Sequence, residues 1–178
     1  MKKNLLFACL LGVSLASCDK EAIKEKLQFE LKQGTAFTIP AFNYVSDTTI
    51  TVSVGNIPTN SSKVFQEKGT SPDLIKSVSV KEVKLTAKNP VTETFDFVKN
   101  VKLYISADGL SEILLASIDS IPVNSSTVTL KTSGESMLEY IKKDNISLKV
   151  SAAAKDSLLQ DTEFDTDMIF TIAADLLD

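Results

Sequence analysis

The sequence predicts a mainly β protein that folds as a two-sheet antiparallel β-sandwich with short helical insertions. Apolar and polar residues alternate with a period of two along most of the chain, and turn-forming residues separate the alternating runs. Helical periodicity is confined to short stretches. Such alternation is typical of strands with one face in a core and one in solvent. An immunoglobulin-like strand order and a jelly-roll order both fit this pattern.

The first half of the chain contains four alternating runs. Their apolar positions are Leu27, Phe29 and Leu31; Phe37 and Ile39; Ile50, Val52 and Val54; and Val78, Val80, Val83 and Leu85. We expect the third run to stop at Gly55-Asn56 and the fourth to stop at Asn89-Pro90, because these residue pairs favour turns.

The second half contains five further runs. They comprise Val101, Leu103 and Ile105; Ile113 to Ala116; Val128 and Leu130; Ile146, Leu148 and Val150; and Phe164 to Ile172. Asp108-Gly109 lies between the first two and predicts a hairpin. We expect residues 110–112 to lengthen its loop. Eight or nine strands result, which is typical of a sandwich.

Short helical segments are expected between the strands. They cover residues 62–68, 72–76, 95–100 and 135–143. The second begins with Pro72 at its first position and Ser71 as its cap. The fourth has the best pattern, because its apolar residues share one face and Lys142 and Lys143 occupy its last turn.

The N-terminus carries an export signal. Lys2 and Lys3 precede an apolar stretch, residues 5–16, and small residues then lead to Cys18. This order is typical of a secretory signal peptide. Leu15-Ala16-Ser17-Cys18 resembles the lipobox of bacterial lipoproteins, which implies cleavage before Cys18 and acylation of its thiol. The sequence thus divides into a signal peptide (1–17), a lipidated N-terminus with a charged tether (18–26) and one β-sandwich domain (27–178).

The resemblance implies an outer-membrane protein held by acyl chains. The order Cys18-x-Lys20-Glu21 is similar to a signal that sends some Bacteroidota lipoproteins to the cell surface, although Ala22 replaces a second acidic residue. The sequence therefore fits a location on either face of the outer membrane. The runs from Val83 to Ile105 and from Ile146 to Ile172 also resemble small Bacteroidota β-sandwich lipoproteins.

Composition argues against most catalytic and binding chemistries. The chain has no histidine, arginine or tryptophan, so Ser-His-Asp catalysis and histidine-containing zinc sites are excluded. Cleavage would remove two of the 19 lysines and none of the 23 acidic residues, leaving a formal charge of 17 − 23 = −6. An acidic chain disfavours nucleic-acid binding. We nominate no catalytic, cofactor-binding or metal-ligating residue, and a carboxylate-based hydrolase is the least favoured alternative.

An acidic row near the C-terminus has two interpretations. Asp161, Glu163, Asp165 and Asp167 alternate along one expected strand. Carboxylates are calcium ligands, but alternate residues of one strand lie about 6.6–6.8 Å apart and seldom converge on one ion. The favoured interpretation is a charged face that protects an edge strand from pairing.

Three Asp-Ser/Thr sequences suggest modification sites. Asp47-Thr48, Asp119-Ser120 and Asp156-Ser157 resemble the O-glycosylation sites of exported Bacteroidota proteins, and turn formation is the competing interpretation. The remaining candidates for a ligand surface are Tyr44, Tyr104 and Tyr140. A buried ring with a satisfied hydroxyl is the commoner role of tyrosine.

These observations together predict a lipid-anchored, non-catalytic binding or structural module at the outer membrane. Its expected partners are the membrane, through the lipid, and an envelope protein or an extracellular ligand. The alternative is a periplasm-facing accessory subunit of an envelope assembly.

Overall fold

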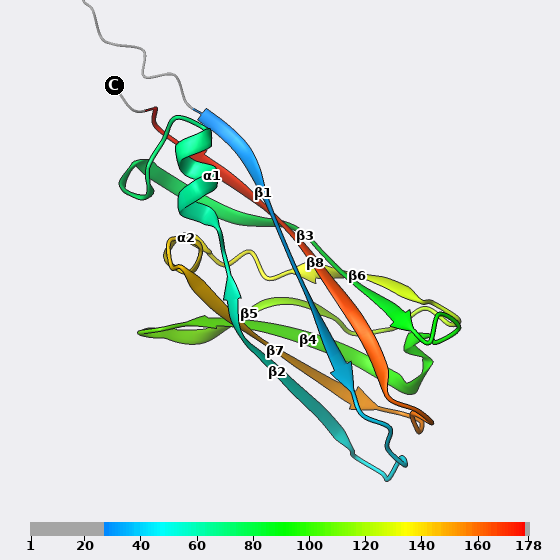
Figure 1. Cartoon of the computed structure of the whole chain (residues 1–178). Coiled ribbons are helices and arrows are strands. Elements are labelled where there is room, and N and C mark those ends of the chain that lie inside the picture. Colours follow the sequence, from blue (N-terminus) through cyan, green and yellow to red (C-terminus); the bar gives the residue numbers. More distant parts are fainter. Residues whose placement is uncertain (1–26, 177–178) are drawn as a thin grey trace, which may run out of the picture.

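The computed structural model describes residues 27–176 and confirms the predicted mainly β fold (Figure 1). Eight antiparallel strands dominate the chain. They are β1 (Leu27–Ile39), β2 (Thr49–Pro58), β3 (Ile75–Asn89), β4 (Val98–Ala107), β5 (Leu110–Ile118), β6 (Thr127–Thr132), β7 (Asn145–Ala154) and β8 (Thr162–Ala174). The helical elements are α1 (Ser61–Glu67), α2 (Leu138–Ile141) and two short 3₁₀ turns, Pro72–Leu74 and Phe95–Phe97.

The strand order is that of a jelly roll. The strands follow one another as β1-β8-β3-β6-β5-β4-β7-β2. The first four form one half of the molecule and the last four form the other, which is the eight-stranded double Greek-key arrangement. Only two residue pairs connect β5 with β6, at Ala116↔Thr132 and Ser117↔Lys131. The two halves are therefore continuous in hydrogen bonding and fold over each other around a shared core.

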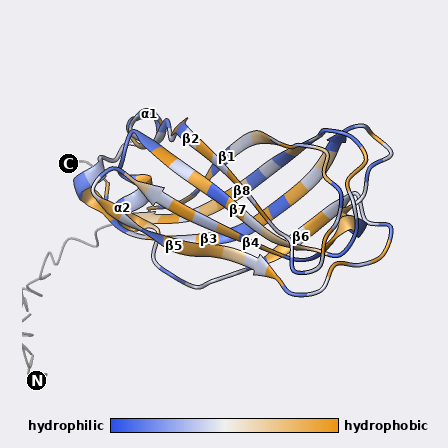
Figure 2. Cartoon of the chain, turned by 90° about the horizontal axis from the view of Figure 1, so that it is seen from below, coloured by the Kyte–Doolittle hydropathy of each residue, from blue (hydrophilic) through white to orange (hydrophobic). Residues whose placement is uncertain are grey.

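The core consists of the inward-facing residues of both halves. Hydrophobic and hydrophilic positions alternate along the strands (Figure 2), so each strand presents its apolar positions to the opposite half. Phe164 lies at the centre of an aromatic cluster, with its ring centroid 5.5 Å from that of Phe37, 5.1 Å from that of Phe95 and 5.9 Å from that of Phe97. An apolar cavity beside these rings has a volume of about 10 Å³. This volume is about that of one water molecule, so the interior is solidly packed there.

The molecule has two structurally distinct ends. The proximal end contains the start of β1, helices α1 and α2, and the end of β8 (Figure 1). The distal end contains the four loops 40–48, 90–97, 119–126 and 155–161, which connect β1 to β2, β3 to β4, β5 to β6, and β7 to β8. Because β1 runs the length of the molecule, these loops lie at the opposite end from the chain's entry point.

The helical predictions were partly correct. The first helix forms within one residue of its predicted bounds, and Pro72 opens a turn in which Ser71 holds the cap position without a side-chain hydrogen bond. The predicted helix 135–143 was too long, because only Leu138–Ile141 is helical. Met137 donates its N–H to the Val78 carbonyl, which ties the preceding segment to β3 instead.

The segment 95–100 was also wrongly assigned to a single helical turn. Only Phe95–Phe97 forms a 3₁₀ turn, and β4 begins at Val98. Phe95, Phe97 and Val98 are all buried. Burial of both rings in the shared core overrides the helical pattern.

Two predicted strand ends were wrong. The strand containing Val54 does not stop at Gly55-Asn56 but continues through a bulge to Pro58, with Asn56 at a φ of 55°. The two residues that favour a turn, Gly55 and Asn56, form the bulge, and the strand resumes pairing at Ile57. The β4–β5 hairpin is also tighter than expected, because Ala107 pairs directly with Leu110 across Asp108-Gly109.

The tight hairpin makes a testable prediction at Gly109. Its φ is +73°, and a Cβ at this position would meet no other atom within 4 Å. A Gly109→Ala substitution therefore causes no steric clash with neighbouring residues, but it still forces a left-handed backbone on a residue with a Cβ. We expect its free energy of unfolding to fall by about 1 kcal/mol. Urea denaturation followed by circular dichroism measures this loss, and Gly109→Asn should lose less.

Candidate functional site

The predicted lipid anchor lies outside the described residues. The signal peptide 1–17, Cys18 and the tether 18–26 precede the first described residue, Leu27. Within residues 27–176 the structure contains no helix of a length and apolarity suited to crossing a membrane.

The acidic row forms a charged outer face, but not on an edge strand. Glu163, Asp165 and Asp167 alternate with buried residues of β8, as predicted. The expectation that they protect an edge is wrong, because β8 lies between β1 and β3. Lys88 of β3 contacts Asp165 at 2.8 Å. That hydrogen bond, followed by the charges of Asp165, Asp167 and Glu163, raises the pKa of Lys88.

This pairing assigns the row a structural role. Lys88 of the neighbouring strand pairs with Asp165 of the row, and no group of three or more candidate metal ligands occurs among the residues that the structure describes. The row therefore stabilises cross-strand packing on the outer face of the β1-β8-β3 layer.

A second cross-strand ion pair yields a pH prediction. The Lys81 ammonium group donates a hydrogen bond to the Glu30 carboxylate, and this bond, then the lysine charge, lowers the pKa of Glu30 below its ordinary 4.5. A lowered carboxyl pKa stabilises the fold above pH 4.5, and that contribution disappears as the pH falls through the folded-state value. In Lys81→Gln we expect the Glu30 pKa to return towards 4.5. Carbon-13 NMR titration of the carboxyl group measures the shift, and Lys149→Gln, whose ammonium group pairs with Glu112 in the other half of the sheet, serves as control.

The three tyrosines do not form one ligand surface. Tyr140 of α2 is buried and donates its hydroxyl to the Ser111 carbonyl at 2.7 Å, as expected for a structural tyrosine. Tyr104 of β4 is half-buried and lies under the Lys149 ammonium group, 4.8 Å from the ring centre. Tyr44 belongs to a distal loop. The three rings therefore lie in three different parts of the fold.

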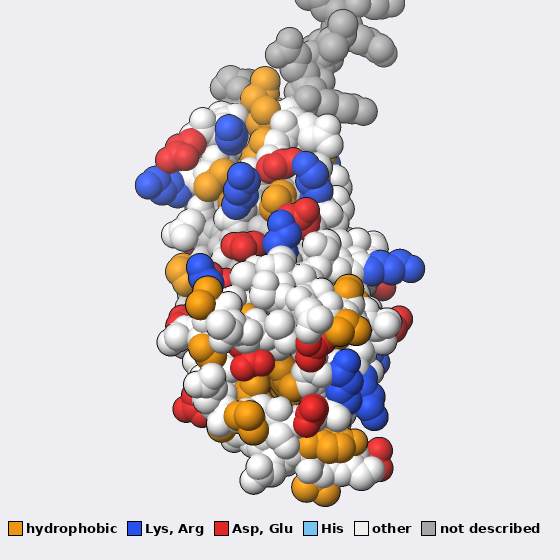
Figure 3. Space-filling model, turned by 90° about the vertical axis from the view of Figure 1, so that its right-hand side faces the viewer, with side chains coloured by type: hydrophobic (Ala, Val, Ile, Leu, Met, Phe, Trp, Pro, Cys, Tyr) orange, Lys and Arg blue, Asp and Glu red, His pale blue; other side chains and the backbone are white. Residues whose placement is uncertain are grey.

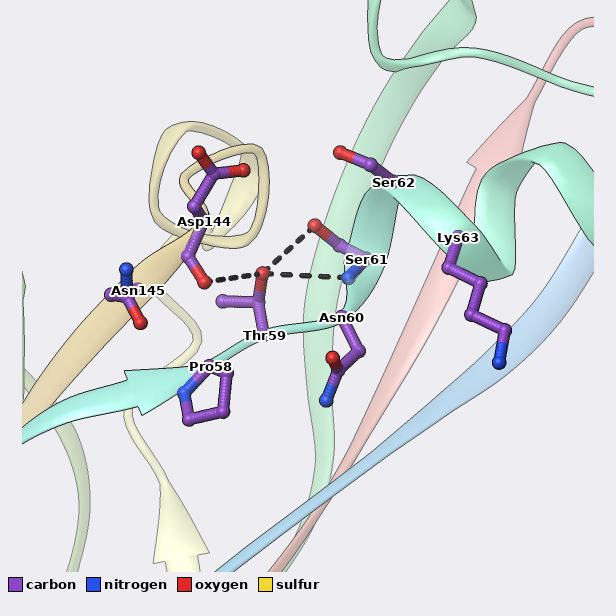
Figure 4. Close-up of a pocket in the computed structure, with 8 residues that line it drawn as sticks. All are labelled: Pro58, Thr59, Asn60, Ser61, Ser62, Lys63, Asp144 and Asn145. Carbon is purple, nitrogen blue, oxygen red and sulfur yellow. Dashed lines mark hydrogen bonds between the residues drawn. The ribbon is translucent and has the colours of Figure 1, made fainter.

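A polar hollow of about 360 Å³ opens at the proximal end, where β2 leads into α1 (Figure 4). It lies between residues 58–63 and Asp144-Asn145. Thr59 and Ser61, both 1% exposed, form its floor. The Thr59 hydroxyl lies 2.6 Å from the Lys143 carbonyl and 3.0 Å from the Ser61 hydroxyl.

The hydrogen bonds of this hollow tie the chain together. Besides its hydroxyl contacts, Thr59 donates its N–H to the Asp144 carbonyl at 2.9 Å, and its own carbonyl accepts from the Gln33 amide. Thr59 thus links β1, β2 and the segment before β7. The polar groups of the floor are therefore satisfied within the chain.

The fold encloses no ligand-sized space beside the aromatic cluster, where the cavity measures about 10 Å³. Among the described residues, the buried polar side chains are all threonine or serine: Thr59, Ser61, Thr70, Thr162 and Thr166. No aspartate or glutamate in that part of the chain is among the buried residues.

Comparison with known proteins adds little beyond this geometry. No family model and no curated protein matches the chain. The chain is similar to solved viral proteins at low identity. The decameric BFDV capsid protein is 9% identical with a TM-score of 0.38, covering 84% of this chain and 99% of that one. The Desmodium yellow mottle tymovirus structure is 12% identical with a TM-score of 0.29, covering 100% of this chain and 97% of that one. The structure of infectious bursal disease virus strain Gx is 8% identical with a TM-score of 0.34, covering 86% of this chain and 37% of that one.

The distal loops contain all three Asp-Ser/Thr sequences. Asp47-Thr48, Asp119-Ser120 and Asp156-Ser157 lie in three different loops of this end. Two of their hydroxyls make structural contacts: that of Thr48 donates to the Val45 carbonyl at 2.6 Å, and that of Ser157 accepts from the Tyr44 N–H at 2.8 Å. Ser120 is exposed. The predicted turn role therefore applies to Thr48, whereas the Ser157 hydroxyl joins two different loops.

The same loops carry apolar side chains that the sequence reasoning missed. Val45, Val91, Val123 and Leu159, one from each distal loop, are between 68% and 88% exposed. We call the four loops 40–48, 90–97, 119–126 and 155–161, with these four side chains, the distal surface. Figure 3 shows hydrophobic side chains towards this end, with acidic side chains and a group of lysines among them. A detectable signal existed, because each residue is a large aliphatic in a turn-rich segment.

Proposed function

We propose that the protein is a lipid-anchored outer-membrane lipoprotein that acts as a non-catalytic binding module through its distal end. The observation that carries this proposal is that the two ends of the fold differ. The chain enters at Leu27 on the proximal end, and the four loops that gather exposed aliphatic side chains lie at the other end (Figure 1). A lipid on Cys18 would hold the proximal end near the bilayer and direct the distal surface away from it.

The acyl anchor is tested by substituting Cys18. Because the mature chain depends on acyl chains for firm membrane binding, Cys18→Ala should move the protein from the membrane fraction to the soluble or uncleaved precursor pool. Fractionation with carbonate washing, together with mass spectrometry of the N-terminal peptide, measures this. Cys9→Ala lies within the signal and serves as the matched control, which should keep its anchor. Equal retention of Cys18→Ala as a mature, washed membrane protein would contradict the proposal.

The membrane face is tested by protease treatment of intact cells. Loss of the wild-type protein while periplasmic markers survive would support display on the cell surface. The second candidate is a periplasm-facing accessory subunit of an envelope assembly, which Ala22 favours because it interrupts the acidic part of the export signal. Full protection from protease, with co-purification of defined envelope partners, would favour that candidate.

A further inference from the structure

We propose that the distal surface is a rigid docking site for a partner protein that presents basic side chains around an apolar hollow. This inference names the partner chemistry of the binding module proposed above and rests on that proposal. It combines three properties of the same four loops: mutual hydrogen bonding, exposed aliphatic side chains and a negative charge.

The four loops are tied into one body. Loop 40–48 is joined to loop 155–161 by reciprocal backbone hydrogen bonds between Phe42 and Leu158 at 2.9 and 3.0 Å. Loop 90–97 is joined to loop 119–126, because the Asp96 carboxylate accepts the Asn124 N–H at 3.1 Å.

A third link joins these two pairs of loops. The Lys155 N–H donates to the Phe97 carbonyl at 2.8 Å, which connects loop 155–161 with loop 90–97. A surface held in this way loses little conformational freedom on binding, and such preorganisation favours affinity.

The apolar side chains of the distal surface serve no packing role in the described chain. Val91 is 82% exposed and Leu159 is 88% exposed, whereas each strand next to them buries its inward-facing aliphatic residues. Scattered exposed apolar residues are ordinary, but within residues 27–176 four of the five large exposed ones share one end, and the fifth, Leu176, lies at the other. Apolar side chains gathered on one end of a molecule are typical of an interaction site.

The negative charge of the four loops indicates which kind of partner binds there. The four loops contain six acidic residues, Asp47, Glu93, Asp96, Asp119, Asp156 and Asp161, and one lysine, Lys155, giving a formal charge of −5. Like charges across an interface are unfavourable, which disfavours a second copy docking on this surface end to end, and an anionic phospholipid headgroup is repelled for the same reason. Without tryptophan, the surface also lacks the best stacking platform for a sugar or cation. A protein with lysine or arginine around an apolar hollow satisfies both the charge and the aliphatic side chains.

The test uses a phage-displayed library of random peptides as the probe and the full chain, purified in detergent, as bait. We expect enriched peptides that combine lysine or arginine with aliphatic or aromatic residues. The double variant Val91→Ser with Leu159→Ser should weaken their binding by about tenfold or more, as for a central apolar contact. The double variant Asp47→Asn with Asp119→Asn should weaken it at low salt, and less at high salt.

Matched controls lie at the proximal end. Leu176→Ser removes an exposed aliphatic side chain there, and Glu67→Gln with Glu139→Gln removes two exposed carboxylates. Both should bind the peptides as the wild type does. Equal binding by the distal variants, or enrichment of acidic peptides, would overturn the proposal. So would self-association or binding to anionic phospholipid vesicles that the distal variants abolish. Because the readout is peptide binding in detergent, it is independent of whether Cys18→Ala loses its anchor.

Discussion

Replacing Phe164 by alanine is expected to lower the free energy of unfolding by about 3–5 kcal/mol. Its ring is fully buried and packs against Phe37 of β1 and against Phe95 and Phe97 of the turn before β4. Truncation removes the contact of three rings at once and enlarges the adjoining cavity. Since those rings come from one half of the jelly roll and from the turn that leads into the other half, the whole domain should lose stability.

Urea denaturation monitored by circular dichroism measures this change. Phe164→Leu, which fills more of the space, should lose less than the alanine variant, and Val91→Ala on the exposed distal surface should leave stability nearly unchanged. A Phe164→Ala loss below about 1 kcal/mol would show that the cluster does not join the two halves.

Replacing Thr166 by valine is expected to raise the free energy of unfolding by about 1–2 kcal/mol. Thr166 lies two residues after Phe164 on the same inward face of β8 and is 1% exposed. Within residues 27–176, its hydroxyl is the only buried side-chain polar atom without a hydrogen-bond partner. Valine keeps the β-branched shape and removes the unpaired oxygen, so burial no longer carries a desolvation cost.

The same urea assay tests whether Thr166→Val raises the free energy of unfolding. Thr166→Ser keeps the hydroxyl but loses the methyl group, so it should destabilise the protein. Thr162→Val is the matched control, because the Thr162 hydroxyl donates to the Gln160 carbonyl at 3.1 Å and its removal breaks a bond. A stabilisation of Thr162→Val equal to that of Thr166→Val would refute the argument from the unpaired hydroxyl.

The sequence predicted the fold class because alternation is a local property. Leu27, Phe29 and Leu31, for example, reveal an inward face without any knowledge of its partner strands. The jelly-roll order was not predictable in this way, because β1 pairs with β8 from the far end of the chain. The excess length of the helix predicted at 135–143 has the same origin, since the tertiary hydrogen bond from the Met137 N–H to the Val78 carbonyl overrides the local pattern at its start.

The candidate site was harder to predict than the fold. Val45 and Leu159 lie far apart in sequence, and long-range hydrogen bonds such as those between Phe42 and Leu158 bring their loops together. The acidic row shows the same limit, because alternation revealed that its residues share a face but not that β8 has a neighbour on each side. In both cases the missing information is strand order.

The pairing of β1 with β8 has a mechanical consequence. Thirteen consecutive residues of β1, from Leu27 to Ile39, face partners on β8 without a register shift. A force applied between the start of β1 and the distal end acts along the strand, perpendicular to its interstrand hydrogen bonds. Such a load shears all of these bonds together instead of unzipping them one by one. A tethered domain that is pulled by its partner would therefore resist extension along the direction in which it is held.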